Sequence, residues 1–198
     1  VDLTEVQRDI LTTLFSSQLP KVEGAQFFVN FEALGATDAP IVITQNEYMR
    51  RMKEMAALQP GMSFYGDMPD SYSLAVNTEN PLVKAIADNA DKALADKVKP
   101  LMDEVKANNE RITELRATAK DDQPLPAEES KQIDDLQTAN NTRREEQTKI
   151  VADYAAGVAE VGQLIDLALL GNGMLHGADL QRFISRSLSI LGKSENGK

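Results

Sequence analysis

Several residue types that carry chemistry are absent or scarce in this chain of 198 residues. It has no cysteine, which excludes disulfides, thiolate metal sites and cysteine nucleophiles. It has no tryptophan and only 5% aromatic residues, which argues against a base-stacking platform for nucleic acids. Its single histidine, His176, has no second histidine or cysteine with which to hold a metal. We therefore expect no metal centre and no thiol chemistry.

The charge balance is strongly acidic. Asp and Glu number 31 against 21 Lys and Arg, a net charge of −10, which opposes non-specific binding to nucleic acids or anionic membranes. No apolar run approaches the roughly 20 residues needed to span a bilayer, and no signal peptide is visible. We expect a cytoplasmic protein that binds neither nucleic acid nor membrane. Because the sequence begins with Val1 rather than methionine, we also expect a processed product or an excised piece of a longer chain.

Residues 1–90 alternate between helix and strand patterns, which predicts an α+β region. Period-two alternation and β-branched runs predict three strands, at 26–34, 41–44 and 72–77, with a turn around Gly35. Helical spacing of apolar residues predicts helices at 2–17 and 45–58, and a third that begins after Asn80. The glycines and proline between 61 and 71 predict a loop.

Residues 91–155 have a different composition. Positions 91–153 hold 15 acidic and 11 basic residues and no glycine. Apolar residues follow heptad spacing in two stretches separated by Pro124 and Pro126. The pattern predicts an inserted antiparallel coiled-coil hairpin with Leu115 near Leu136, apolar at its base and near its tip but polar in the middle.

The last section is the most apolar part of the sequence. The pattern predicts a largely buried helix over 158–170, a break at 171–177, and an amphipathic helix over 179–191. Two such helices offer more apolar surface than they can hide from each other, so we expect 156–192 to pair with a second copy in a four-helix bundle. We expect 193–198 to be a disordered tail. The residues expected in the dimer interface are Leu164, Ile165, Ala168, Leu169, Phe183, Ile184, Ser187, Leu188 and Leu191.

Methionine is concentrated in one short stretch. Five of the seven methionines lie between Met49 and Met68. Flexible, polarizable thioethers can adapt to many apolar partners, which makes this stretch a candidate binding surface. The alternative is that these side chains simply pack over the small sheet. The candidate residues are Met49, Met52, Met55, Met62, Phe64, Tyr65 and Met68.

No catalytic arrangement emerges from the sequence. The glycine-rich segment 171–177 lacks the lysine and the glycine spacing of a phosphate-binding loop. Acidic pairs lie beside the expected hairpin tip, where we expect solvated carboxylates rather than a general acid or base. We therefore expect no enzyme and assign no catalytic, cofactor-binding or metal-binding residue. An enzyme with an acidic site remains an alternative.

Six short motifs in a fixed order resemble the C-terminal domain of the HtpG-type chaperones, the bacterial ninety-kilodalton heat-shock proteins. Each motif is weak alone, and the order and spacing carry the resemblance, which covers about 1–90 and 155–192. The motifs are 38–42 (DAPIV), 48–53 (YMRRMK), 74–77 (LAVN), 80–84 (NPLVK), 163–170 (QLIDLALL) and 182–187 (RFISRS).

The resemblance implies an α+β domain whose last two helices make a constitutive homodimer. It also implies that the helix carrying Met49 to Met55 and the following loop contact unfolded client proteins. The family's ATP and magnesium site and its catalytic glutamate belong to an N-terminal domain, and a catalytic arginine to a middle domain. Neither domain is in this chain, so no cofactor is expected in it. The inserted hairpin departs from the family, which usually has a short connection there.

The expected function is therefore homodimerisation and client binding for an ATP-dependent chaperone that assists folding under stress, with a co-chaperone as a possible further partner. The alternative is a stand-alone coiled-coil adaptor that dimerises through the heptad hairpin.

Overall fold

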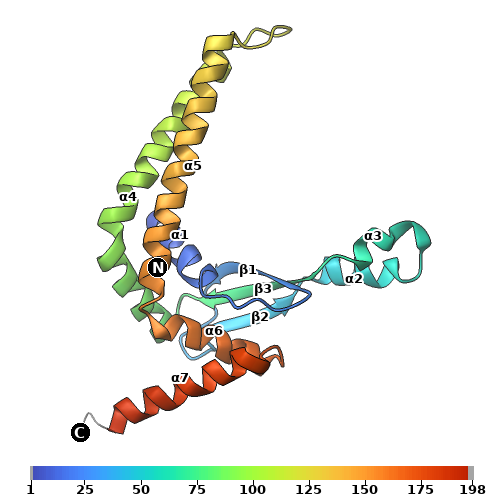
Figure 1. The fold of residues 1–198 in the computed structure, drawn as a ribbon, viewed down its shortest axis with the longest axis vertical. Helices are drawn as coiled ribbons and strands as arrows, with labels where there is room; N and C mark the ends of the chain where they lie inside the picture. The colour runs from blue at the N-terminus through green and yellow to red at the C-terminus, as the bar shows by residue number, and fades with distance from the viewer. Residues whose placement is uncertain (1, 196–198) are drawn as a thin grey trace. The chain divides into compact units, whose positions relative to one another are not determined.

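The computed structural model describes residues 2–195, which comprise helices and one three-stranded sheet (Figure 1). The chain divides into two units. One takes the chain up to Thr13 together with Asn89–Tyr154, and the other takes Leu14–Asp88 together with the chain from Ala155. The two units do not coincide with the segments expected at 1–90 and 91–155, because helix α1 (Glu5–Ser16) contributes residues to both units.

The sheet has the order β1-β3-β2. Strand β3 (Asp70–Asn77) lies in the centre, parallel to β1 (Ala25–Glu32) and antiparallel to β2 (Ile41–Gln45). The register pairs Leu74 of β3 with Val29 and with Ile43. The second half of β3 is buried, as expected for a central strand flanked on both edges. The expected α+β class and three-stranded sheet are confirmed.

The connection between β1 and β2 is held by the side chain of Asn77, which is fully buried. Its Oδ1 accepts hydrogen bonds from the backbone N–H groups of Leu34 and Glu79, both at 3.1 Å. Its Nδ2 donates to the carbonyl oxygens of Gly35 at 2.8 Å and Ala39 at 3.2 Å. Gly35 has a φ of 115°, which favours glycine and makes the expected turn possible.

The segment between β2 and β3 forms three short helices rather than a helix and a loop. They are α2 (Glu47–Ala56), the 3-10 helix η1 (Pro60–Met62) and α3 (Ser63–Gly66). Pro60 occupies the first position of η1, where a backbone N–H would have no hydrogen-bond partner within the helix, so proline is tolerated there. None of the three helices contains a buried residue. In Figure 1 they extend beyond the end of the sheet at which β2 ends and β3 begins.

Helices α4 (Pro81–Ala117) and α5 (Ala127–Ala155) supply the expected hairpin, and α4 continues through Pro100. Asn80 begins α4, since its Oδ1 accepts from the N–H of Leu82 at 2.9 Å. Near the tip, Leu115 and Leu136 share an apolar cluster with Ile112, Ile133 and Leu125, which confirms the predicted pairing of the arms.

The predicted polar middle of the hairpin is also confirmed. Asn108 Nδ2 donates to Asn140 Oδ1 at 3.0 Å, and Asn140 Nδ2 donates to Asn109 Oδ1 at 2.9 Å. One turn further toward the base, the guanidinium of Arg143 lies 3.0 Å from a carboxylate oxygen of Glu104. Polar pairs of this kind fix the register of two helices, because a shifted pairing would leave buried amides without partners.

The chain ends with α6 (Ala159–Gly171), which contacts β2, and α7 (Gly177–Glu195), which contacts α6. The bounds agree closely with the helices expected at 158–170 and 179–191. Helix α7 continues to Glu195, so the first residues of the expected tail are helical. The rest of that tail, 196–198, lies outside the described residues.

Candidate interaction surfaces

Helix α7 is attached to α6 by two polar contacts. Gln163 Nε2 donates a hydrogen bond of 2.6 Å to Ser187 Oγ. Arg186 forms an ion pair with Asp166, whose residue surface is 6% exposed. Gly162 makes room for this pair, because a Cβ there would lie 2.6 Å from Nη1 of Arg186. Together these contacts fix which face of α7 is turned toward α6.

The surroundings of Asp166 affect its ionisation. Burial raises the pKa of its carboxyl group above the usual 3.8, and the charge and hydrogen bond of Arg186 act in the opposite direction. The charged form of Asp166 therefore depends on Arg186 staying in place.

The nine residues expected in a dimer interface fall into three groups. Leu164, Ile165 and Leu169 are buried within their own chain. Ala168, Phe183 and Ser187 are half-buried. The exposed group consists of Ile184 at 40%, Leu188 at 64% and Leu191 at 64%.

The exposed group is called here the α7 apolar face and consists of Ile184, Leu188 and Leu191. Their spacing of four and three residues places them along one side of the helix. The sequence stripe did not single out three further apolar side chains that are also exposed on α6 and α7: Leu167, Leu170 and Ile190. The signal for Leu167 and Leu170 was the nearly continuous apolar run of α6, which has more apolar residues than one buried face requires.

Helix α2 separates charged and apolar side chains. It begins at Asn46, whose Oδ1 accepts from the N–H of Met49 at 3.1 Å. On its charged side Arg50 pairs with Glu47 and Glu54, and the hydrogen bond from Arg50 lowers the pKa of Glu47. Lys53 ties the helix to the start of β3 through Asp70, at 2.9 Å.

The candidate methionine-rich residues lie on and after the other side of α2. Phe64 is 72% exposed and Met55 is also exposed. The half-buried members are Met49, Met52, Met62, Tyr65 and Met68. The ring of Phe64 packs edge-on against Tyr65, with centroids 5.6 Å apart. We call these seven residues the methionine-rich surface.

Two exposed apolar residues beside this surface were missed. Tyr48 precedes Met52 by one helical turn and is 65% exposed, and Leu58 is 83% exposed in the connection to η1. The helical spacing of Tyr48, Met52 and Met55 was the signal that could have included Tyr48.

In 2–195 no three histidine or acidic side chains gather as a metal site. No single helix in that range is long and apolar enough to cross a membrane, and only α5 and α6 taken together as a broken pair have the length and composition.

Comparison with known proteins identifies relatives for nearly the whole chain. It is 40% identical over 187 residues to the chaperone protein HtpG of Bacteroides thetaiotaomicron, an alignment covering 93% of this chain. It is 41% identical over 202 aligned positions, covering 96% of the chain, to the chaperone protein HtpG of Porphyromonas gingivalis. The chain is homologous to one part of the HtpG chaperones. The resemblance stated from its six motifs is confirmed.

The HtpG-like chain spans 28% of the length of each of these two relatives. Because the alignments cover 93% and 96% of this chain, they extend across the hairpin. No family model and no solved structure matches this chain.

Proposed function

We propose that this chain is the dimerisation and client-binding domain of an HtpG-type chaperone that assists protein folding under stress in the cytoplasm. The similarity to curated chaperones supports a role in a chaperone. The ATPase activity of such a chaperone, with its ATP and magnesium, would belong to other domains. This chain would contribute surfaces rather than catalytic groups.

The observation that carries the dimerisation proposal is the α7 apolar face. Three aliphatic side chains along one side of α7 remain exposed although Ser187 and Arg186 attach the helix to α6. Burying one such side chain is worth about 1.5–3 kcal/mol. In a twofold dimer the same face meets itself, so each residue contributes twice. Two helices from each copy would then make the four-helix bundle expected from the sequence.

Dimerisation has a mechanical consequence for the larger chaperone. Joining two long chains at one end raises the effective concentration of their distant domains for each other, without any new contact between those domains. A stable contact at α6 and α7 would therefore promote encounters between the two ATPase domains.

The dimerisation proposal is tested with Leu188→Asp. The substitution removes an apolar contact on both copies, about 3–6 kcal/mol in total, which weakens association by at least about a hundredfold. Light scattering should show a dimer for the unmodified chain and a monomer for the variant at the same micromolar concentration. Leu82→Asp is the control, since Leu82 is 58% exposed on α4 and lies outside α6 and α7. A dimer that survives Leu188→Asp, or dissociates equally with Leu82→Asp, would refute the assignment.

The client-binding proposal rests on the methionine-rich surface. Its helices bury no residue, and its apolar side is opposite an ion-paired charged side. Methionine side chains can repack around apolar segments of different shape, as binding to varied unfolded chains requires.

Client binding is tested by suppression of aggregation. Replacing Leu58 and Phe64 together by serine should reduce, by about half or more, the chain's ability to keep a chemically denatured reporter enzyme in solution. Phe28→Ser is the matched control, because Phe28 is an exposed aromatic residue on β1. Equal suppression by all three proteins would mean that clients bind elsewhere.

The alternative of an adaptor that dimerises through the hairpin receives less support. The apolar seam near the tip is occupied by the two arms of the same chain, and so are the asparagines in the middle. A second copy would have to displace these contacts before it could use the heptad positions.

A further inference from the structure

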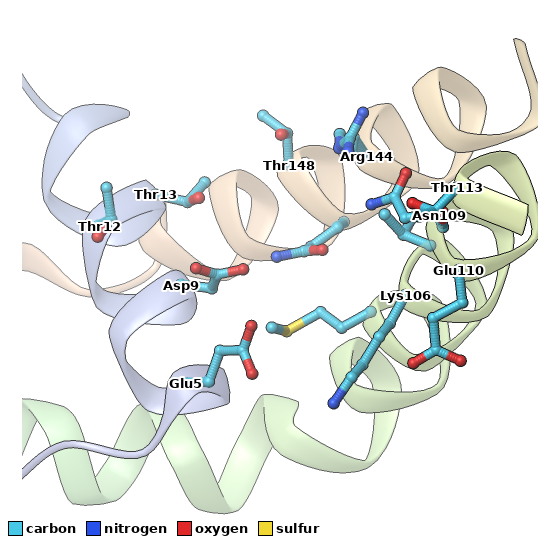
Figure 2. A pocket seen from close by; sticks show the side chains of 13 residues that line it. Glu5, Asp9, Thr12, Thr13, Lys106, Asn109, Glu110, Thr113, Arg144 and Thr148 are labelled. Atoms are coloured by element: carbon cyan, nitrogen blue, oxygen red, sulfur yellow. The ribbon is translucent and has the colours of Figure 1, made fainter. Parts of the chain in front are cut away.

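The hollow in Figure 2 lies between α1, α4 and α5 and has a volume of about 710 Å³. Carboxylates of Glu5 and Asp9 line it from α1, and the basic side chains of Lys106 and Arg144 line it from the hairpin. Because side chains of both charges surround this hollow, it favours no single class of ligand. The polar contacts between α6 and α7 are more specific, since each of them requires one orientation of α7.

Helix α7 is held on the rest of its chain without a buried side chain. Between 177 and 194 no residue of α7 is buried. The half-buried residues lie along one side of the helix, and only Leu180 and Phe183 among them are apolar. Two partly covered side chains bury little apolar area, so apolar packing alone gives only a weak preference for one rotation of α7 about its axis.

Two polar contacts supply the missing preference. Arg186 forms its ion pair with Asp166, which is 6% exposed. Gln163 Nε2 donates to Ser187 Oγ at 2.6 Å, and this hydroxyl in turn donates to the carbonyl oxygen of Phe183 at 2.8 Å. Hydrogen bonds are directional, so these contacts are made together at only one rotation of α7.

The same contacts contribute less to stability than their number suggests. Nε of Arg186 and Oε1 of Gln163 are buried and have no hydrogen-bond partner in the part of the chain that the structure describes. A buried polar atom without a partner costs free energy. Replacing a buried ion pair by apolar side chains is often neutral or stabilising. The pair between Arg186 and Asp166 is therefore better explained by the orientation that it imposes.

The orientation of α7 decides whether its apolar face is accessible. At about 100° per residue, Arg186 lies about 160° around the helix from both Ile184 and Leu188. A rotation of about 100° would move Leu188 to the present position of Ser187 against α6 and carry Arg186 away from Asp166. The hydrophobic effect favours that rotation, because it buries a leucine that is now 64% exposed. The ion pair opposes it.

We propose that Arg186 and Asp166 are positioning residues for dimerisation, because their ion pair prevents α7 from turning its apolar face onto α6. The face then stays available to a second copy of the chain. This inference rests on the proposed dimer and assigns to the pair a role that neither residue has through direct contact with the second copy.

The test compares dimer dissociation constants, measured by sedimentation over a dilution series. Arg186→Gln should raise the constant at least about tenfold, because the apparent affinity falls with the fraction of chains whose α7 has the competent orientation. Asp166→Asn breaks the pair from the other side and should have the same effect. The control Arg182→Gln removes the same charge from α7, but Arg182 pairs with Asp179 of its own helix, so the constant should change by less than about threefold.

A thiol on the α7 apolar face measures the orientation itself. The chain has no cysteine, so Leu188→Cys introduces a single thiol. In chains diluted until they are monomeric, this thiol should react with a maleimide at least about threefold more slowly when Arg186→Gln is also present, since the rotated helix turns it toward α6. Arg182→Gln should leave the reaction rate unchanged.

The outcomes separate this inference from the proposed dimer. An unmodified chain that is monomeric at micromolar concentration would refute both. A dimer that is unaffected by Arg186→Gln and by Asp166→Asn would leave dimerisation intact and overturn the positioning role. Equal weakening by Arg182→Gln would overturn it in favour of a general effect of charge. Weaker association with an unchanged thiol rate would overturn it in favour of direct contact between Arg186 and the second copy.

Discussion

Replacing Gly162 by alanine tests how α7 is held on α6. An alanine Cβ would lie 2.6 Å from Nη1 of Arg186, closer than these atoms can approach. The guanidinium is the end of a flexible side chain, so it can move without straining the backbone. When the guanidinium moves, the buried carboxylate of Asp166 loses its ion-pair partner.

The expected magnitude is the difference between two opposing effects. Breaking a buried ion pair costs about 3–5 kcal/mol, and the partial exposure of Arg186 reduces this to about 2–3 kcal/mol. Alanine is favoured over glycine inside a helix by about 1 kcal/mol. Gly162→Ala should therefore lower the free energy of unfolding by about 1–2 kcal/mol, although helix propensity alone predicts an increase.

Urea unfolding of four proteins separates the two effects. In an Asp166→Asn background the carboxylate is gone, so Gly162→Ala should become neutral or stabilising. Gly171→Ala is the control, because a Cβ at Gly171 has no atom within 4 Å. If Gly162→Ala lowers stability equally with and without Asp166, the effect does not involve the ion pair and the reasoning is wrong.

Two further predictions concern buried polar groups. Because burial raises the pKa of Asp166, the folded chain holds the proton of this carboxyl group more tightly than the unfolded chain does. The contribution of Asp166 to stability is therefore greatest below about pH 3.8 and is lost as the pH rises through the folded pKa. Asp166→Asn should remove this pH dependence in unfolding titrations, and an unchanged profile would contradict the prediction. Asn77→Ala should lower the free energy of unfolding by about 3 kcal/mol, since four backbone groups lose a partner. The control Thr78→Ala removes one long hydrogen bond of 3.4 Å and should lower it by less than about 1 kcal/mol. Similar losses for both variants would argue against the role of Asn77.

Elements with a strong period were predictable from the sequence. The heptads of the hairpin fixed the pairing of Leu115 with Leu136 and the polar middle, because both depend only on spacing about the turn. The strands were located, but their order was not, since alternation does not show that β3 inserts between β1 and β2. Three of the four hydrogen bonds of Asn77 were also invisible, because they join segments about 40 residues apart.

The candidate surfaces were predictable only in part. The stripe on α7 was read as one continuous face, and the structure divides it into Ser187 toward α6 and Leu188 toward solvent. Such features depend on contacts between helices, which periodicity within one helix does not specify.

In the proposed dimer the α7 apolar face joins two copies of this chain. Sedimentation equilibrium of the unmodified chain at micromolar concentration tests it most directly, because the result depends on mass and not on shape. A dimer has a mass of 43.4 kDa, twice the chain mass of 21.7 kDa, and this is the result that we expect. A single species of 21.7 kDa throughout that concentration range would contradict it.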